Sequence, residues 1–148
     1  MREGSGRFWQ TASAGAGVPD VISTTWTVAA LLAFLVKHLL ADFLLQTSWM
    51  ANGKERPTGW FFPLLAHVCV HAVGTAIIFG LMAPAYLWIA GVDFIVHFAI
   101  DRAKGLLNRF FDNDPTKTGF WWLLGIDQTL HHLTHIGFAI LIAVVRTG

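Results

Sequence analysis

The chain has 148 residues, of which 55% are hydrophobic and only 13% are Asp, Glu, Lys or Arg. A typical soluble domain carries roughly 25% charged residues. The formal net charge is +1, and the single cysteine cannot form an internal disulfide. These figures exclude a disordered chain, a nucleic-acid-binding module with a basic face and a disulfide-stabilised secreted domain. They indicate a small integral membrane protein, with lipids as its surroundings.

The chain divides into an arm and a membrane domain. Residues 1–25 are rich in Gly, Ala, Ser and Thr and lack the apolar run of a secretory signal, so we expect a flexible arm that a protein partner could order. Residues 26–148 are predicted to form an all-α, four-transmembrane-helix bundle, because four stretches have the roughly 20 mostly apolar residues that a span needs. These stretches lie near residues 26–46, 60–82, 85–104 and 120–145.

Two longer connections separate the predicted spans. Residues 51–59 are polar and contain helix breakers, whereas 105–119 begin with an apolar pattern typical of an interfacial helix or of a continued third span. Six Lys and Arg residues lie in or beside these two connections, against three on the opposite side. Because short cytoplasmic loops carry the excess of Lys and Arg, we expect both connections to be cytoplasmic and both termini to lie outside.

Ionisable residues recur every four positions within each predicted span, which places them on one helix face. They are His38 and Asp42, followed by Gln46, in the first span; His67 and His71 in the second; Asp93, His97 and Asp101 in the third; and Asp127, His131 and His135 in the fourth. An ionisable side chain at the bilayer centre costs roughly 2.5–3.5 kcal/mol. We therefore expect the four polar stripes to face one another in the core of the bundle.

Counting residues inward from the predicted span ends places one side chain from each helix at a common depth. This predicted layer consists of His38, His67, His97 and Asp127, and it is flanked by Asp42, His71, Asp101 and His131. At a greater depth Lys37 and Asp93 are expected to form an ion pair, unless Lys37 reaches the interface instead.

Two segments of similar sequence hint at an internal duplication. Residues 58–62 (TGWFF) precede the second span and residues 118–122 (TGFWW) precede the fourth, which aligns His67 with Asp127 and His71 with His131. The first and third spans share a His-x-x-x-Asp pattern. The bundle could therefore consist of two duplicated helical hairpins with a site at their interface.

Imidazole and carboxylate groups without a thiolate suit a divalent zinc, iron or manganese ion. The predicted metal ligands are His38, His67, His71, His97, Asp127 and His131, and the catalytic candidates are Asp42 and Asp101, as further ligands or as carboxylates that orient the imidazoles. A bound cation would make its water acidic enough to act as hydroxide near neutral pH. This interpretation favours hydrolysis of a lipid-like substrate at the cytoplasmic leaflet.

Two alternatives remain open from the same residues. Chains of His and Asp in membranes also carry protons or ions. Polar side chains can equally bond neighbouring helices, in which case the protein is a scaffold or accessory subunit of a larger membrane complex. A second copy of the chain is a further candidate partner.

Three motifs together resemble a known family. They are HLLADFLLQ at residues 38–46, DFIVHFAIDRAK at 93–104 and DQTLH at 127–131. They are similar to motifs in a family of small bacterial inner-membrane proteins that is described only as a domain of unknown function. The resemblance covers roughly residues 30–145 and implies an all-helical protein of the bacterial inner membrane. A looser similarity to membrane-bound metal-dependent hydrolases favours the metal hypothesis by analogy.

Overall fold

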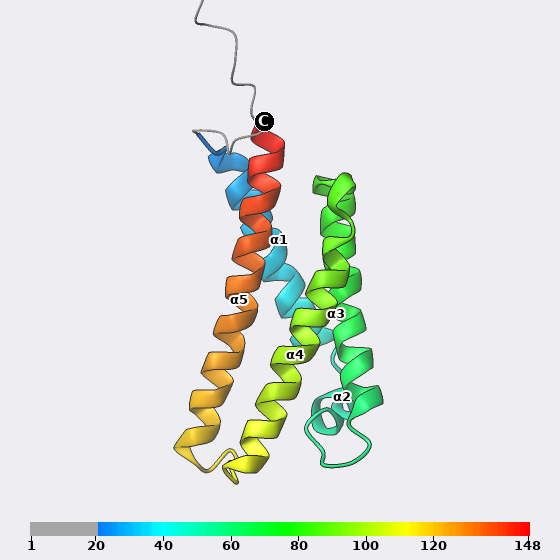
Figure 1. Ribbon diagram of the computed structural model, residues 1–148, viewed down its shortest axis with the longest axis vertical. Coiled ribbons are helices and arrows are strands. Elements are labelled where there is room, and N and C mark those ends of the chain that lie inside the picture. The colour runs from blue at the N-terminus through cyan, green and yellow to red at the C-terminus, as the bar shows by residue number, and fades with distance from the viewer. Residues whose placement is uncertain (1–20) are drawn as a thin grey trace, which may run out of the picture.

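A computed structural model describes residues 21–148, so the prediction for residues 1–20 of the arm lies outside the described part of the chain. Every regular element among residues 21–148 is helical (Figure 1). The elements are α1 (Thr24–Leu39), η1 (Leu40–Leu44), α2 (Ser48–Gly53), α3 (Phe61–Met82), η2 (Pro84–Tyr86), α4 (Ile89–Phe110) and α5 (Thr118–Thr147).

Three segments are long and apolar enough to cross a membrane: α1 continued by η1 over Thr24–Leu44, α3, and α5. The helix α4 has 22 residues, which is enough length, but it carries Asp93, Asp101, Arg102 and Lys104 among its first sixteen residues. This charge keeps α4 below the apolar content expected of a span that stands alone in lipid. The all-helical architecture is thus confirmed, with three candidate spans and one helix of mixed character.

The first helix begins at a polar cap. Ser23 adopts an extended backbone and its hydroxyl accepts a hydrogen bond from the backbone N–H of Trp26, which satisfies one of the free donors at the helix start. Beyond Leu39 the helix widens into one π-helical turn, η1, which contains Asp42. Such turns occur frequently at functional sites because they change the direction of the side chains they carry.

The helices run side by side with the α3–α4 hairpin against the pair formed by α1 and α5 (Figure 1). The start of α1 and the end of α5 lie together, since the backbone N–H of Ser23 donates to the Thr147 hydroxyl at 2.9 Å. The short helix α2 lies at the opposite end of the bundle (Figure 1). We call these the η2 end, where α3 turns into α4, and the α2 end.

The segment predicted as a polar loop at 51–59 is partly helical. Residues 48–53 form α2, which packs so closely on α3 that a Cβ atom at Gly53 would lie 2.5 Å from the Cγ atom of Pro63. The expectation was wrong here because Asn52 and Gly53 end this helix rather than interrupt a loop. The close approach directs the next residue, Lys54, into the interior of the bundle.

The third predicted span starts later and ends later than expected. Residues 84–86 form the separate turn η2, so α4 begins at Ile89 and continues to Phe110. Of the two alternatives for the stretch after residue 105, the structure has the continued helix. Pro84 stands at the first position of η2, where its missing N–H leaves no partner unsatisfied.

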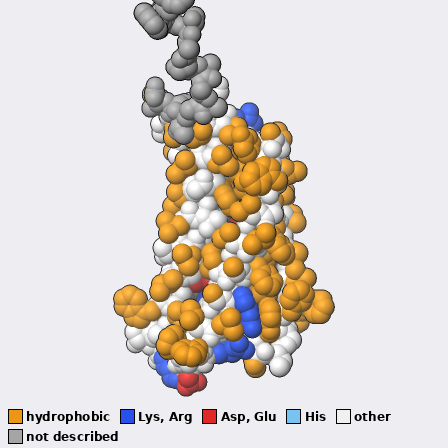
Figure 2. All heavy atoms as spheres, viewed as in Figure 1, with side chains coloured by type: hydrophobic (Ala, Val, Ile, Leu, Met, Phe, Trp, Pro, Cys, Tyr) orange, Lys and Arg blue, Asp and Glu red, His pale blue; other side chains and the backbone are white. Residues whose placement is uncertain are grey.

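The apolar core lies at the η2 end. Phe34, Phe79 and Phe138 meet there, with ring centroids between 5.9 and 6.2 Å apart. Each ring comes from a different helix, and all three side chains are buried. Toward the α2 end the helices face a polar interior. The outer surface seen in Figure 2 is largely apolar, with Lys and Arg gathered near the α2 end.

Candidate metal centre

The polar side chains of the four long helices meet in three layers, spaced one helical turn apart. The layers follow from antiparallel packing: a step of four residues forward along α3 corresponds to a step of four residues back along α4, and the same holds for α4 and α5. The stripes predicted in the third and fourth spans supply one residue to each layer, whereas those in the first and second spans supply two layers and Lys37 and Thr75 complete the third. The stripes face the interior, as expected.

The middle layer consists of four histidines, one from each long helix. His97 stands between His71 and His131, with ring centroids 3.9 Å from each. His38 closes the ring, because its centroid lies 5.5 Å from that of His71 and 5.8 Å from that of His131. All four side chains are buried.

The layer toward the η2 end is built on an ion pair. Lys37 donates to Asp93 at 3.0 Å, which confirms the expected pair, and the Thr75 hydroxyl donates to the same carboxylate at 2.6 Å. His135 completes this layer, with its Nε2 atom 3.1 Å from Lys37 Nζ. Thr75 continues the four-residue spacing of His67 and His71, so its inward position could have been predicted from the sequence.

The layer toward the α2 end contains Asp42, His67, Asp101 and Asp127. His67 Nε2 lies 3.5 Å from Asp42 and 3.3 Å from Asp101. Asp101 also accepts from Lys54 at 2.9 Å, and Asp127 accepts from Lys104 at 3.2 Å. This layer holds the half-buried Asp42 and two of the three buried aspartates, and it is the most acidic part of the interior.

The predicted common layer was therefore wrong by one turn in two helices. His38 and His97 share a layer, but the partners at their level are His71 and His131, while His67 and Asp127 lie one turn nearer the α2 end. Counting from span ends assumed that the helices start level. They do not, because α4 continues well past Lys104 before the turn into α5.

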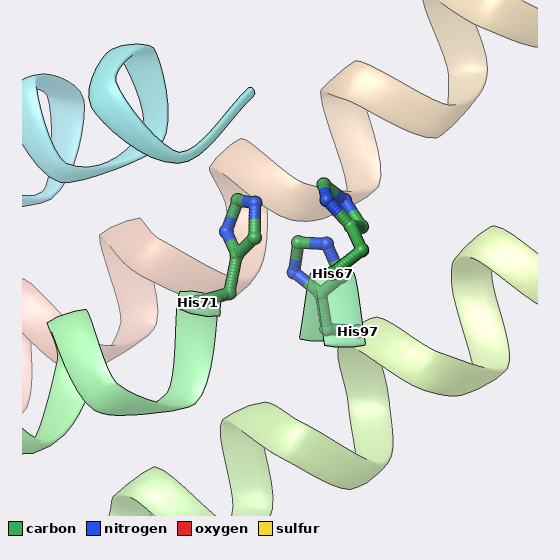
Figure 3. Close-up of side chains that lie close together, drawn as sticks. All are labelled: His67, His71 and His97. Atoms are coloured by element: carbon green, nitrogen blue, oxygen red, sulfur yellow. The ribbon is translucent and has the colours of Figure 1, made fainter. Parts of the chain in front are cut away.

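Two overlapping groups of side chains have the spacing of a metal site. His67, His71 and His97 present ring nitrogens that all lie within 4.8 Å of one another, as do the ligand atoms of His97, Asp101 and His131. In Figure 3 the rings of the first group gather where α3 meets α4. Five predicted site residues thus belong to one or both of two groups, each of which could hold an ion.

The remaining predicted site residues lie around these groups. Asp42 contacts His38 at 3.1 Å and His71 at 3.0 Å. Asp42 and His38 therefore border the first group. His38 also bonds Gln128 of α5 at 2.9 Å. Asp127 lies 3.6 Å from His131 but its nearest cation is Lys104, which leaves it on the side of the cluster farthest from His67 and His71.

His97 is the residue that both groups share. It is 1% exposed, and neither of its ring nitrogens has a hydrogen-bond partner among residues 21–148. The nearest carboxylate oxygen, on Asp101, is 3.8 Å from Nε2 and too far for a hydrogen bond. Leaving a buried polar group unsatisfied costs about 1–3 kcal/mol, so an imidazole in this state points to a missing water or ion.

The charges of the interior are unevenly paired. Lys37, Lys54 and Lys104 each lie within 3.2 Å of one buried aspartate. Asp42 is the exception: among the described residues the basic groups within 4 Å of its carboxylate are the histidines 38, 67 and 71. A further cation at these imidazoles would balance the Asp42 charge.

Two of these lysines lie in the interior and not in the loops where the sequence predicted them. Lys54 and Lys104 were counted as loop cations that set the orientation, yet both side chains are about 10% exposed and bond core aspartates. Lys104 lies three residues after Asp101, on the same helix face, which was a usable signal. Lys54 gave no signal, because its burial depends on how α2 packs against α3.

No curated protein and no solved structure matches the chain. A family model matches residues 30–147, a range that includes every histidine and every buried aspartate described above. The family resemblance expected from the three motifs is thereby confirmed. By this match the chain belongs to the family described as "Protein of unknown function (DUF3307)".

Proposed function

We propose that the protein is a multi-pass membrane protein that binds one divalent metal ion among His67, His71 and His97, with Asp101 and His131 beside these ligands. The observation that carries the proposal is His97, a buried imidazole without a hydrogen-bond partner at the point shared by both candidate ligand groups. Zinc, iron and manganese all accept this donor set.

A metal ion would also improve the electrostatics of the interior. With neutral histidines, three lysines face four aspartates in the three layers. An unpaired buried charge is strongly destabilising. A divalent ion at the imidazoles beside Asp42 supplies the missing positive charge without requiring a proton on each ring.

The reaction we propose is metal-dependent hydrolysis of a lipid-like substrate. A metal ion with three protein ligands keeps a position open for water and makes that water acidic. Asp42 lies beside the ligands and its side chain is 15% exposed, against 2% for Asp101. Asp42 is therefore the acid best placed to take a proton from an incoming water, and Asp101 orients His67 and His131.

The proton or ion pathway is less favoured by the arrangement of the core. The polar layers end at Lys37 and Asp93, and the next level is the contact of Phe34, Phe79 and Phe138. A conduit needs polar groups or water on both sides of the membrane. A polar interior sealed at one end suits a binding site.

We further propose that α4 is the fourth span, that the membrane is the inner membrane of a bacterium, and that residues 51–59 and 105–119 are cytoplasmic. The layers support four spans, because α4 contributes a residue to each of them. Residues aligned by the apparent duplication, such as His71 and His131, share a layer. The two duplicated hairpins stay a prediction.

The test is the metal content of protein purified in detergent without chelators, measured by mass spectrometry before and after loading with zinc, iron(II) or manganese. We expect one ion per chain in the wild type and none in His97→Leu. His132→Gln is the matched control, because His132 lies beside His38 but belongs to neither ligand group. A folded wild type that takes up no ion, or equal losses in both variants, would overturn the proposal.

A further inference from the structure

A polar cavity of about 390 Å³ opens beside the candidate metal centre at the α2 end. It lies between η1, α2, α4 and α5. Its polar lining consists of Asp42, Gln46, Lys54, Glu55, Lys104 and Gln128. Phe43 and Leu124 form its apolar edge.

The cavity borders the candidate metal centre through Asp42. Asp42 lines it and also contacts His38 and His71, so one side chain belongs to both the cavity and the cluster. The other three buried aspartates have side chains only 2% exposed. A ligand that enters here meets Asp42 first.

Two lysines give the cavity a preference for anions. An ammonium group has three N–H donors. Lys54 donates to Asp101, and Lys104 is shared between Asp127 and Glu55, the latter at 3.4 Å. Each lysine therefore keeps donor capacity for a ligand oxygen without giving up its aspartate.

Charge limits the kind of anion. With a divalent ion bound, the three lysines and four aspartates of the interior leave one net positive charge, and Glu55 stands at the rim with its side chain 34% exposed. Glu55 balances that charge while it contacts Lys104, so a ligand with a single negative charge keeps the interior neutral when it displaces the Glu55 carboxylate toward solvent. A phosphodiester carries one such charge and offers two free oxygens to the lysines.

The outer wall of the cavity faces lipid. Phe43 is 74% exposed and the next residue, Leu44, is 68% exposed. Aromatic residues of the kind that mark the membrane interface are exposed at the same end, among them Trp121 and Trp122. The head group of a lipid would thus lie at the level of the cavity while its acyl chains pass along Phe43 and Leu44.

We propose that this cavity binds the anionic phosphodiester head group of a membrane lipid, which would be the substrate class of the adjacent metal centre. The inference rests on the proposed function, because only the metal-loaded interior has the charge to accept an anion. It adds the chemical class of the ligand and the residues that recognise it.

The test uses the full chain in detergent, loaded with zinc, with lipid binding measured by native mass spectrometry. Phosphatidylglycerol and phosphatidylcholine of the same chain length are offered together, and soluble glycerol 3-phosphate and inorganic phosphate are offered as competitors. We expect phosphatidylglycerol to be retained at least about tenfold over phosphatidylcholine, a difference of about 1.4 kcal/mol. Neither soluble phosphate compound should displace it at equal concentration.

Variants separate the cavity from the rest of the surface. Glu55→Gln should tighten phosphatidylglycerol binding, because it removes a competing anion from Lys104. Ala51→Leu fills the cavity and should abolish the preference, whereas Ala29→Leu, an exposed alanine of α1 outside the lining, should leave it unchanged.

Zinc content is measured in every sample, which distinguishes the two proposals. Protein without zinc after loading overturns the metal centre. Zinc-loaded protein that binds both lipids equally, or releases phosphatidylglycerol to soluble phosphate, overturns the head-group site alone. Loss of the preference in Ala29→Leu as well as Ala51→Leu overturns its placement in this cavity.

Discussion

Lys37 on α1 and Asp93 on α4 form a 3.0 Å ion pair at the boundary between the polar and the apolar halves of the bundle interior. Both side chains are almost wholly buried, and the level beyond them is the contact of three phenylalanine rings. One of these rings, Phe34, stacks on His135 with centroids 5.2 Å apart. Because both side chains are so deeply buried, each charge depends on the other for its compensation.

Removal of Lys37 alone should destabilise the fold strongly. In Lys37→Met the Asp93 carboxylate keeps only Thr75 and His135 as partners. A buried ion pair broken on one side costs about 3–5 kcal/mol, and we expect a loss of this size in the free energy of unfolding measured in detergent. The double variant Lys37→Met/Asp93→Leu should recover much of it. If the two losses simply add, the residues are not coupled and the pair is not the stabilising contact.

The approach of α2 to α3 predicts a second effect on stability. A Cβ atom in Gly53→Ala would lie 2.5 Å from Pro63, so α2 must move away and withdraw Lys54 from Asp101. We expect a loss of about 1–3 kcal/mol, as for other overpacked sites. Gly80→Ala is the control, because nothing lies within 4 Å of its added Cβ and alanine favours a helix by up to about 1 kcal/mol. Equal thermal midpoints for the two variants would contradict the tight α2–α3 contact.

The stripes could be predicted from the sequence because a spacing of four residues fixes a helix face whatever the helices pack against. The inward direction followed from the cost of polar groups in lipid. For this reason the sequence predicts His38, His71, His97 and His131 as candidate site residues. The family membership followed in the same way, from motifs that contain three of these positions, His38, His97 and His131.

The composition of the layers was less predictable than the stripes, because it depends on where each helix turns. The α3–α4 turn at η2 sets His71 level with His97, and the turn between Phe110 and Thr118 sets His97 level with His131. Lys54 depends on a still less local feature, the packing of a six-residue helix on Pro63. Local pattern thus reveals which residues point inward, and tertiary packing decides which of them meet.

The unequal exposure of the four aspartates in the interior layers predicts a difference in their chemical reactivity. A hydrophobic carbodiimide should modify Asp42 faster than Asp93, Asp101 or Asp127, because only Asp42 borders the cavity with an appreciable exposed fraction. Mass spectrometry of the digested protein locates the adduct. Zinc loading should slow the reaction, since it engages the imidazoles that touch Asp42. Modification of Asp101 ahead of Asp42 would show that the route into the interior lies elsewhere.

The charged residues of α4 raise the question of whether it crosses the membrane, and their partners predict that it does. Asp93 pairs with Lys37, and Asp101 pairs with Lys54. Lys104 pairs with Asp127, and the Arg102 guanidinium lies 3.7 Å above the ring of Trp60. Because each of these charges has a partner within the bundle, α4 need not expose them to lipid even though its composition alone is too polar.

Cysteine labelling tests this directly. In a Cys69→Ser background, Thr58→Cys and Thr116→Cys should react with an impermeant maleimide on the same face of sealed membrane vesicles, because α3 and α4 together cross twice. Ala85→Cys, exposed at the turn between these helices, should react on the opposite face. If α4 does not cross, Thr116→Cys will label together with Ala85→Cys instead. That result would leave three spans. The layers of the metal centre would then lie at a different depth in the membrane from the one that we propose.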